Sequence, residues 1–309
     1  MRNIIISNRT ARDIDEQVAK VLKGLGDPEP PLDLRLVREL LRLDKQYYSS
    51  SASGPLAEKI SRLKVAGKQV IERPTLLFEA IRKLDLKALY LPDRKRILLD
   101  KNLPALKHRW NEAHEIGHSI IEWHADSMLG DDQHTLRPEC QERVEAEANY
   151  AAGQMLFLQE RFSSDARDVT PSIASVLSLK ERFGNTITTT MWRFIERSNE
   201  LPMVGMISGH PSPACRKPDF NPLAPCRYLI RSPAFAARFS SLEELPLFQA
   251  ISSYCSAQRR GYLGKSQIVL TDDNGDRHLF NFETFFNTYE ALTLGVYRCV
   301  DKSGIYIAR

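Results

Sequence analysis

The chain lacks the features that mark secreted, membrane-spanning and thiolate-metal proteins. Its five cysteines are odd in number and show no Cys-x-x-Cys spacing, so we expect free thiols rather than a disulfide framework or a thiolate metal site. No apolar run approaches the roughly 18 residues that a transmembrane helix needs, and the apolar part of residues 1–9 is too short for a signal peptide. We therefore expect a cytoplasmic protein with no membrane partner.

A strong excess of one charge is also missing. The 309 residues carry a formal net charge of +4, with 42% hydrophobic and 27% charged residues, which is the composition of an ordinary globular protein. The length allows two domains or one large domain. A slight basic excess is, on its own, weak support for binding to nucleic acid.

What the chain does contain is His114-Glu-Ile-Gly-His118, two histidines four residues apart with a glutamate between them. Four residues advance a helix by about 400°, so both imidazoles leave one face of the helix and can share one metal ion. Glu115 follows the first histidine, where its carboxylate can accept a proton from an attacking water. Apolar flanking residues predict a core-facing helix, with the histidines at its semi-buried margin. The motif indicates a zinc peptidase.

A catalytic zinc ion usually has three protein ligands and one open position, so a third ligand is needed. Residues 138–157 read as a second helix that carries Glu142, Glu145 and Glu147. Glu145 shares a helix face with Asn149, and the pair suits a zinc ligand and a group that orients a metal-binding imidazole. For any one glutamate taken alone, a solvated acidic face is the better interpretation.

Two motifs in order along the chain carry a family resemblance. The run Arg109-Trp-Asn-Glu-Ala-His-Glu-Ile-Gly-His118, followed by Val144-Glu-Ala-Glu-Ala-Asn-Tyr-Ala-Ala152 and Met155-Leu156, resembles the ImmA/IrrE family of metallopeptidases. The likeness covers roughly residues 10 to 200. The chain departs from the family pattern at Phe157-Leu158-Gln159, where a proline is often found. This departure concerns the end of the helix and not the metal site.

The resemblance implies that His114, His118 and Glu145 bind zinc and that Glu115 is the general base. It implies a gluzincin-like helical core with a small sheet. It also implies a narrow protein substrate, a helix-turn-helix repressor of the XRE type, whose cleavage releases stress-response or mobile-element genes. Two imidazoles and a carboxylate favour one Zn²⁺ per chain, although the same ligands can hold Mn²⁺ or Fe²⁺.

The sequence does not identify the group that stabilises the oxyanion of the tetrahedral intermediate. Peptide hydrolysis needs such a group close to the metal. Tyr150, His124 and His134 are candidates because they lie near the motifs in the sequence, and none of them belongs to a motif of its own.

We expect an α+β protein in three parts. Residues 1–160 are predicted to form a mostly helical, zincin-like metallopeptidase core with a small sheet, in which residues 11–50 form amphipathic helices. Residues 161–200 read as a short helical segment with helix-turn-helix spacing. Residues 201–309 follow a proline-rich change in composition and are strand-rich, with a hairpin turn at 272–276, as in a sensor or substrate-holding module.

Two functions of other classes remain open from the sequence. One is a zinc-containing regulatory protein that acts by binding a protein, without proteolysis. The other is a regulator that binds DNA directly through residues 172–197, with an affinity that falls steeply with salt. For this segment we favour packing over DNA recognition, because its second helix has few basic residues before Arg193.

Overall fold

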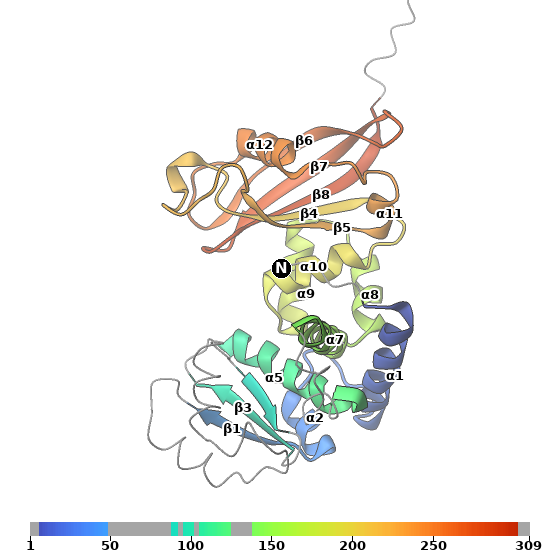
Figure 1. Ribbon diagram of the computed structural model, residues 1–309. Helices are drawn as coiled ribbons and strands as arrows, with labels where there is room; N and C mark the ends of the chain where they lie inside the picture. Colours follow the sequence, from blue (N-terminus) through green and yellow to red (C-terminus); the bar gives the residue numbers. More distant parts are fainter. Residues whose placement is uncertain (1–5, 49–87, 92–94, 102–104, 125–137, 302–309) are drawn as a thin grey trace, which may run out of the picture. The chain divides into compact units, whose positions relative to one another are not determined.

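The computed structural model describes residues 6–48, 88–91, 95–101, 105–124 and 138–301 (Figure 1). The chain forms two compact units. The first comprises Met1–Phe162 with Phe183–Asn185, and the second comprises Ser163–Arg182 with Thr186–Arg309. Among the described helices, none is both long enough and apolar enough to cross a membrane. The three-part division expected from the sequence stays a prediction.

Among the described residues of the first unit, the framework consists of four helices: α1 (Asn8–Gly24), α2 (Leu34–Leu41), α5 (Ala105–Ile120) and α7 (Pro138–Leu156). The first two begin at side-chain caps, because Ser7 and Asp33 accept the N–H groups of Thr10 and Arg35. α7 packs against both α1 and α5. The helical core expected from the sequence is therefore present.

A small sheet accompanies these helices, with the strand order β1-β3-β2. Its strands are β1 (Asp44–Tyr48), β2 (Ala88–Leu91) and β3 (Arg96–Asp100). β1 runs parallel to β3 and β2 runs antiparallel to it. α5 packs against β2 and β3, and this contact places the helix of the histidine motif beside the sheet.

The prediction of helices throughout residues 11–50 was wrong at its end, because Asp44–Tyr48 is a strand. This strand pairs with β3 in a register that places Asp44 opposite Arg96, and Arg96 Nε donates to Asp44 Oδ2 at 2.7 Å. The pairing partner lies about fifty residues away in the sequence. Local periodicity does not contain such a contact.

The end of α7 shows how the helix terminates in this chain, which lacks the proline often found here in the family pattern. Leu158 and Gln159 both adopt left-handed conformations, with φ angles of 51° and 48°. The N–H of Gln159 returns to the carbonyl of Gln154 at 2.9 Å, which satisfies one of the last carbonyls of the helix. The helix therefore stops about three turns after Glu145, the predicted metal ligand, by backbone conformation alone.

The second unit combines helices with a five-stranded antiparallel sheet of order β5-β4-β8-β7-β6. The strands are β4 (Met203–Ser208), β5 (Cys226–Arg231), β6 (Gly261–Thr271), β7 (Arg277–Phe286) and β8 (Ala291–Val300). The helices are α9 (Ile173–Phe183), α10 (Ile187–Glu196), α11 (Pro233–Ala236) and α12 (Glu244–Tyr254), and α8 (Glu160–Arg167) joins the two units in sequence. The expectation of an α+β chain with a strand-rich C-terminal part is confirmed.

Both faces of this sheet are covered, as β4 shows. All six of its residues are buried. Val204 and Met206 face a core that includes phenylalanines of α11 and α12. Gly205 points to the opposite face, where a Cβ atom would collide with Ile195 of α10. In Figure 1, α12 accordingly lies on one side of the sheet and α10 on the other.

The second of the two helices with helix-turn-helix spacing, α10, is therefore part of this packing. α10 begins at Thr186, whose side chain accepts the N–H of Thr189. Trp192 packs edge-on against Tyr228 of β5, with ring centroids 5.2 Å apart. Even Arg193 is buried, with 6% of the residue exposed. These contacts agree with packing as the role of α10.

The β6–β7 hairpin is present, and its turn is fixed by a carboxylate clamp. Asp273 Oδ2 accepts the N–H and hydroxyl of Ser240, and Asp273 Oδ1 accepts the N–H and hydroxyl of Ser241, all within 3.0 Å. The Ser241 and Ser240 hydrogen bonds hold the pKa of Asp273 well below its usual range. A depressed folded-state pKa stabilises the native state above the ordinary pKa, and this contribution disappears as pH falls through the folded-state value.

We expect Asp273→Asn to lower the thermal unfolding midpoint at about pH 7. The difference from wild type should shrink only below about pH 4, where the carboxylate of the unfolded chain takes up a proton, and should disappear as pH falls through the lower folded-state pKa and the clamp itself is protonated. Thermal unfolding from about pH 7 down to well below pH 4 measures the difference. The exposed Asp219→Asn is the matched charge control and should follow wild type throughout. An Asp273→Asn deficit that is equally large at the lowest pH would contradict the clamp as its cause.

Candidate metal centre

The centre depends on an unusually close approach of α5 and α7. Gly117 lies between the two histidines of the motif, and a Cβ atom there would be 2.8 Å from the backbone oxygen of Ala148 and 3.3 Å from Cβ of Ala151. Only a glycine on one helix facing small residues on the other allows this spacing. The sequence of α7, rich in alanine at this point, supplies the second half of the contact.

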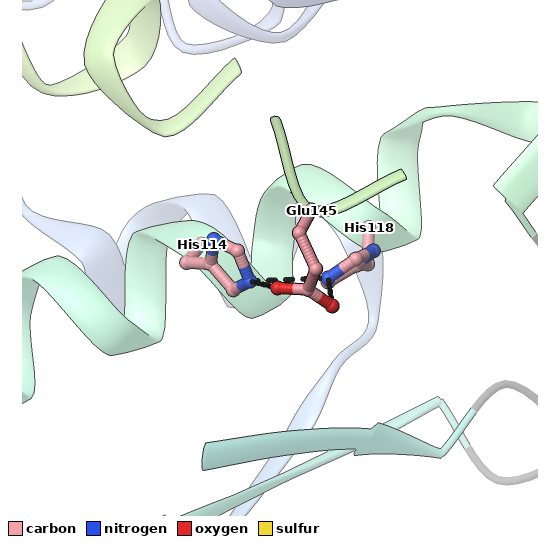
Figure 2. Close-up of side chains that lie close together, drawn as sticks. All are labelled: His114, His118 and Glu145. Atoms are coloured by element: carbon pink, nitrogen blue, oxygen red, sulfur yellow. Dashed lines mark hydrogen bonds and ion pairs between the residues drawn. The ribbon is translucent and has the colours of Figure 1, made fainter. Parts of the chain in front are cut away.

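Across this contact, three side chains point toward one another (Figure 2). His114 and His118 come from successive turns of α5, and Glu145 comes from α7. The two Nε2 atoms are 3.1 Å apart, and Glu145 approaches them at 3.0 Å from His114 Nε2 and 3.7 Å from His118 Nε2. One ligand atom from each residue lies within 4.8 Å of the others.

This donor set fits a divalent metal ion. Two imidazole nitrogens and a carboxylate oxygen are ligands that zinc accepts, and donor atoms bound tetrahedrally to one zinc ion lie about 3.3 Å apart. The observed separations bracket that value. His118 is buried, whereas the Glu145 side chain is 59% exposed. A cation at this point would therefore be held from one side and remain accessible from the other.

The charges around the three ligands also favour one positive charge among them. Burial and the nearby charge of His114 lower the pKa of His118 to about 3. Burial also opposes a charge on His114, but the hydrogen bond to Glu145 and the charges of Glu115 and Glu145 outweigh it and raise the pKa of His114. The bond and charge of His114 likewise overcome the effect of burial and lower the pKa of Glu145. A divalent cation would take the place of the proton on His114.

A second layer of residues supports both histidines. Asn149 Oδ1 lies 3.1 Å from His114 Nδ1, so Asn149 accepts the Nδ1–H of that imidazole and leaves Nε2 as the ligand atom. On the other histidine, Nδ1 of His118 lies 3.0 Å from Nδ1 of His124. His124 Nε2 in turn lies 3.0 Å from Glu147 Oε2.

The remaining predicted residues lie in different places. Glu115 is 4% exposed and follows His114 on α5. His124 lies behind His118, on the side away from Glu145. Tyr150 faces α1, where its hydroxyl donates to Asp15 at 3.1 Å, and the structure does not bring it to the three ligands. His134 lies outside the described residues.

Sequence reasoning missed two buried carboxylates of this unit. The sequence offered Glu147 as one of three candidate ligands or as part of a solvated acidic face, yet it is 2% exposed. Glu112 of α5 is also buried, with 6% exposed, and binds Arg38 of α2 at 2.6 Å and Lys45 of β1 at 2.9 Å. The ion pairs of Glu112 thus connect α5, the helix of the histidine motif, to α2 and β1. No local pattern shows that either group is buried, because Glu112 is paired with residues of α2 and β1, and Glu147 accepts from Trp123 and His124 as well as from Arg143 of its own helix.

Comparison with known proteins assigns this part of the chain. Residues 71–191 match the family model Peptidase_M78, described as IrrE N-terminal-like domain. This stretch of the chain is therefore similar to an IrrE N-terminal-like domain. The matched stretch contains both histidines of the motif, Glu115 and Glu145. It confirms the family resemblance found in the sequence and points to a peptidase.

One solved structure with a similar fold is described as a Mycobacterium tuberculosis transcriptional regulator. The two share 15% sequence identity and a TM-score of 0.52, with 94% of this chain and 78% of that chain covered. At this identity the likeness shows the fold alone. Among curated proteins, none matches the chain in sequence.

We expect Gly117→Ala to push α5 and α7 apart, to destabilise the fold by about 1–3 kcal/mol and to weaken metal binding, because the new methyl group meets the backbone of Ala148. Denaturant unfolding and zinc titration against a chelator measure the two effects. Gly153→Ala is the matched control within α7, since nothing lies within 4 Å of its Cβ position. It should stabilise the helix by about 0.5–1 kcal/mol. Equal behaviour of the two variants would contradict a structural role for the close approach.

Proposed function

We propose that this protein is a metal-dependent endopeptidase, with zinc as its metal. The observation that carries the proposal is the convergence of His114, His118 and Glu145 from two helices onto one point, within a stretch that matches a peptidase family. In this proposal the three residues are the metal ligands, Asn149 orients His114, and the helical unit is a zincin-like core.

The chemistry that the residues would perform follows from their positions. A zinc ion bound there would polarise the peptide carbonyl and acidify a water molecule. Glu115, adjacent to His114 in the sequence and 4% exposed, would accept the proton of the attacking water and later deliver it to the leaving amine. The exposed carboxylate of Glu145 leaves one side of the centre open to a peptide.

We further propose that the substrate is a folded regulatory protein of the XRE helix-turn-helix type, cut once in the cytoplasm to release stress or mobile-element genes. The resemblance to the ImmA/IrrE family supports this substrate. In this proposal residues 201–309 sense a ligand or hold the substrate. Action by protein binding alone, without proteolysis, is the alternative that the test below separates from peptidase activity.

Direct DNA recognition through α10 receives less support from the structure. A recognition helix needs one face free to enter a groove. In α10 the buried residues are Ile187, Thr190, Met191, Arg193, Phe194 and Ile195. The basic residue that a DNA contact would use, Arg193, is among them, and it pairs with Glu196 at 3.7 Å.

We expect Glu115→Gln to lose cleavage by about 10²–10⁴-fold while it retains the metal, because the amide keeps the shape of the side chain and cannot accept a proton. New protein N-termini in cells that express wild type or Glu115→Gln, at rest and after DNA damage, identify the substrate. A single N-terminus that depends on Glu115 and lies inside a helix-turn-helix repressor is the expected result.

The exposed Glu122→Gln, seven residues further along the chain, is the matched control and should cleave like wild type. Removal of the metal by a chelator should abolish cleavage, and added zinc should restore it. If Glu115→Gln left both the N-termini and the cellular effect unchanged, the binding-regulator alternative would replace the peptidase.

A further inference from the structure

A line of buried polar groups leads away from the metal centre. It begins at His118, continues through His124 and ends at Glu147, with 3.0 Å between nitrogens at the first step and 3.0 Å between nitrogen and oxygen at the second. The three residues are 4%, 0% and 2% exposed. Their hydrogen bonds are therefore not exchanged with bulk water, and the direction of each bond is set by the groups themselves.

Glu147, at the far end of this line, determines which ring nitrogen of His124 carries the hydrogen. Glu147 is surrounded by donors, because Trp123 Nε1 donates to it at 2.6 Å and Arg143 Nε donates at 2.9 Å. A carboxylate in this setting is an acceptor only. His124 must therefore present its Nε2–H to Glu147.

The tautomer of His124 in turn determines which ring nitrogen of His118, the proposed metal ligand, carries the hydrogen. A neutral imidazole carries one hydrogen, so His124 with its hydrogen on Nε2 has a bare Nδ1. That nitrogen faces Nδ1 of His118, which must donate its hydrogen across the 3.0 Å gap. The lone pair of His118 is left on Nε2, the atom directed at His114 and Glu145.

The direction matters because an imidazole can bind a cation only through its bare nitrogen. The two ligating histidines reach the same tautomer by different routes. His114 relies on Asn149, which is exposed, whereas His118 relies on the enclosed pair His124 and Glu147. Asn149, Glu145 and Glu147 all belong to α7, so one helix supplies a ligand and sets the tautomer of both others.

We propose that His124 and Glu147 are positioning residues that hold His118 in the Nδ1–H tautomer, with Nε2 free for the metal ion. This inference rests on the proposed metal centre. It gives His124 a role different from the oxyanion stabiliser considered from the sequence.

The test uses the full chain with ¹⁵N-labelled histidine and compares wild type with His124→Leu and His124→Gln. Nitrogen chemical shifts of the metal-free protein at about pH 8.5, where His118 is neutral, report which ring nitrogen of His118 carries the hydrogen. Competition with a chromophoric chelator reports the zinc affinity. Neither measurement requires peptidase activity.

Wild type should show His118 with its hydrogen on Nδ1. His124→Leu removes the acceptor, so the hydrogen should move to Nε2 for a large part of the population and zinc affinity should fall by about 10–100-fold. The amide of His124→Gln can accept from His118 and donate to Glu147, so it should recover most of the affinity. Trp123→Phe is the control, because it removes one donor to Glu147 and keeps the line intact.

Two results would overturn the inference. One is wild-type His118 with its hydrogen on Nε2, a finding that needs no variant to fold. The other is a folded His124→Leu with wild-type tautomer and zinc affinity. Either result leaves the proposed function to be judged by Glu115→Gln. Conversely, wild type that shows the Nδ1–H tautomer and cuts no protein upholds the positioning role and rejects the peptidase.

Discussion

The close approach of α5 and α7 at Gly117 is the constraint on which the rest of the centre depends. Ligands that bind one metal ion must lie about 3.3 Å apart, and the helix repeat secures this spacing only within α5. The third ligand comes from another helix, so its distance is set by how near the two backbones come. A glycine on α5 opposite alanines on α7 brings Glu145 within 3.0 Å of His114. Larger side chains at this contact would leave the two histidines of the motif in place, but they would hold Glu145 too far from the histidines to share a metal ion with them.

The same contact separates an enclosed side of the centre from an exposed side. His118, His124 and Glu147 form the enclosed side, where water does not compete for hydrogen bonds and the tautomer of an imidazole is well defined. Glu145 forms the exposed side. A peptidase needs both properties at once, because the ligands must be held rigidly while a polypeptide reaches the metal. The burial of each residue thus follows its role in the proposed chemistry.

Sequence reasoning reached the parts of this centre that depend on helical periodicity. The four-residue spacing placed His114 and His118 on one face, and the same spacing paired Glu145 with Asn149. It could not reach His124 and Glu147, because their contact joins a residue beyond α5 to the middle of α7. Glu147 therefore read as part of a solvated acidic face. β1 was missed for the same physical reason, since a polar segment became a strand only through pairing with β3.

The second unit bears on which function the chain can have. Its α9–α10 pair has the spacing of a DNA-binding motif, but spacing describes the backbone and recognition depends on which face is free. The face of α10 that includes Met191 and Phe194 is buried, and Gly205 of β4 is a glycine because Ile195 occupies the space of its side chain. To enter a groove, the helix would have to leave the sheet and expose that apolar face to water, which costs about 25 cal/mol for each Å². Of the functions proposed for the chain, peptide chemistry at the metal centre is therefore better supported by the structure than contact between this helix and DNA.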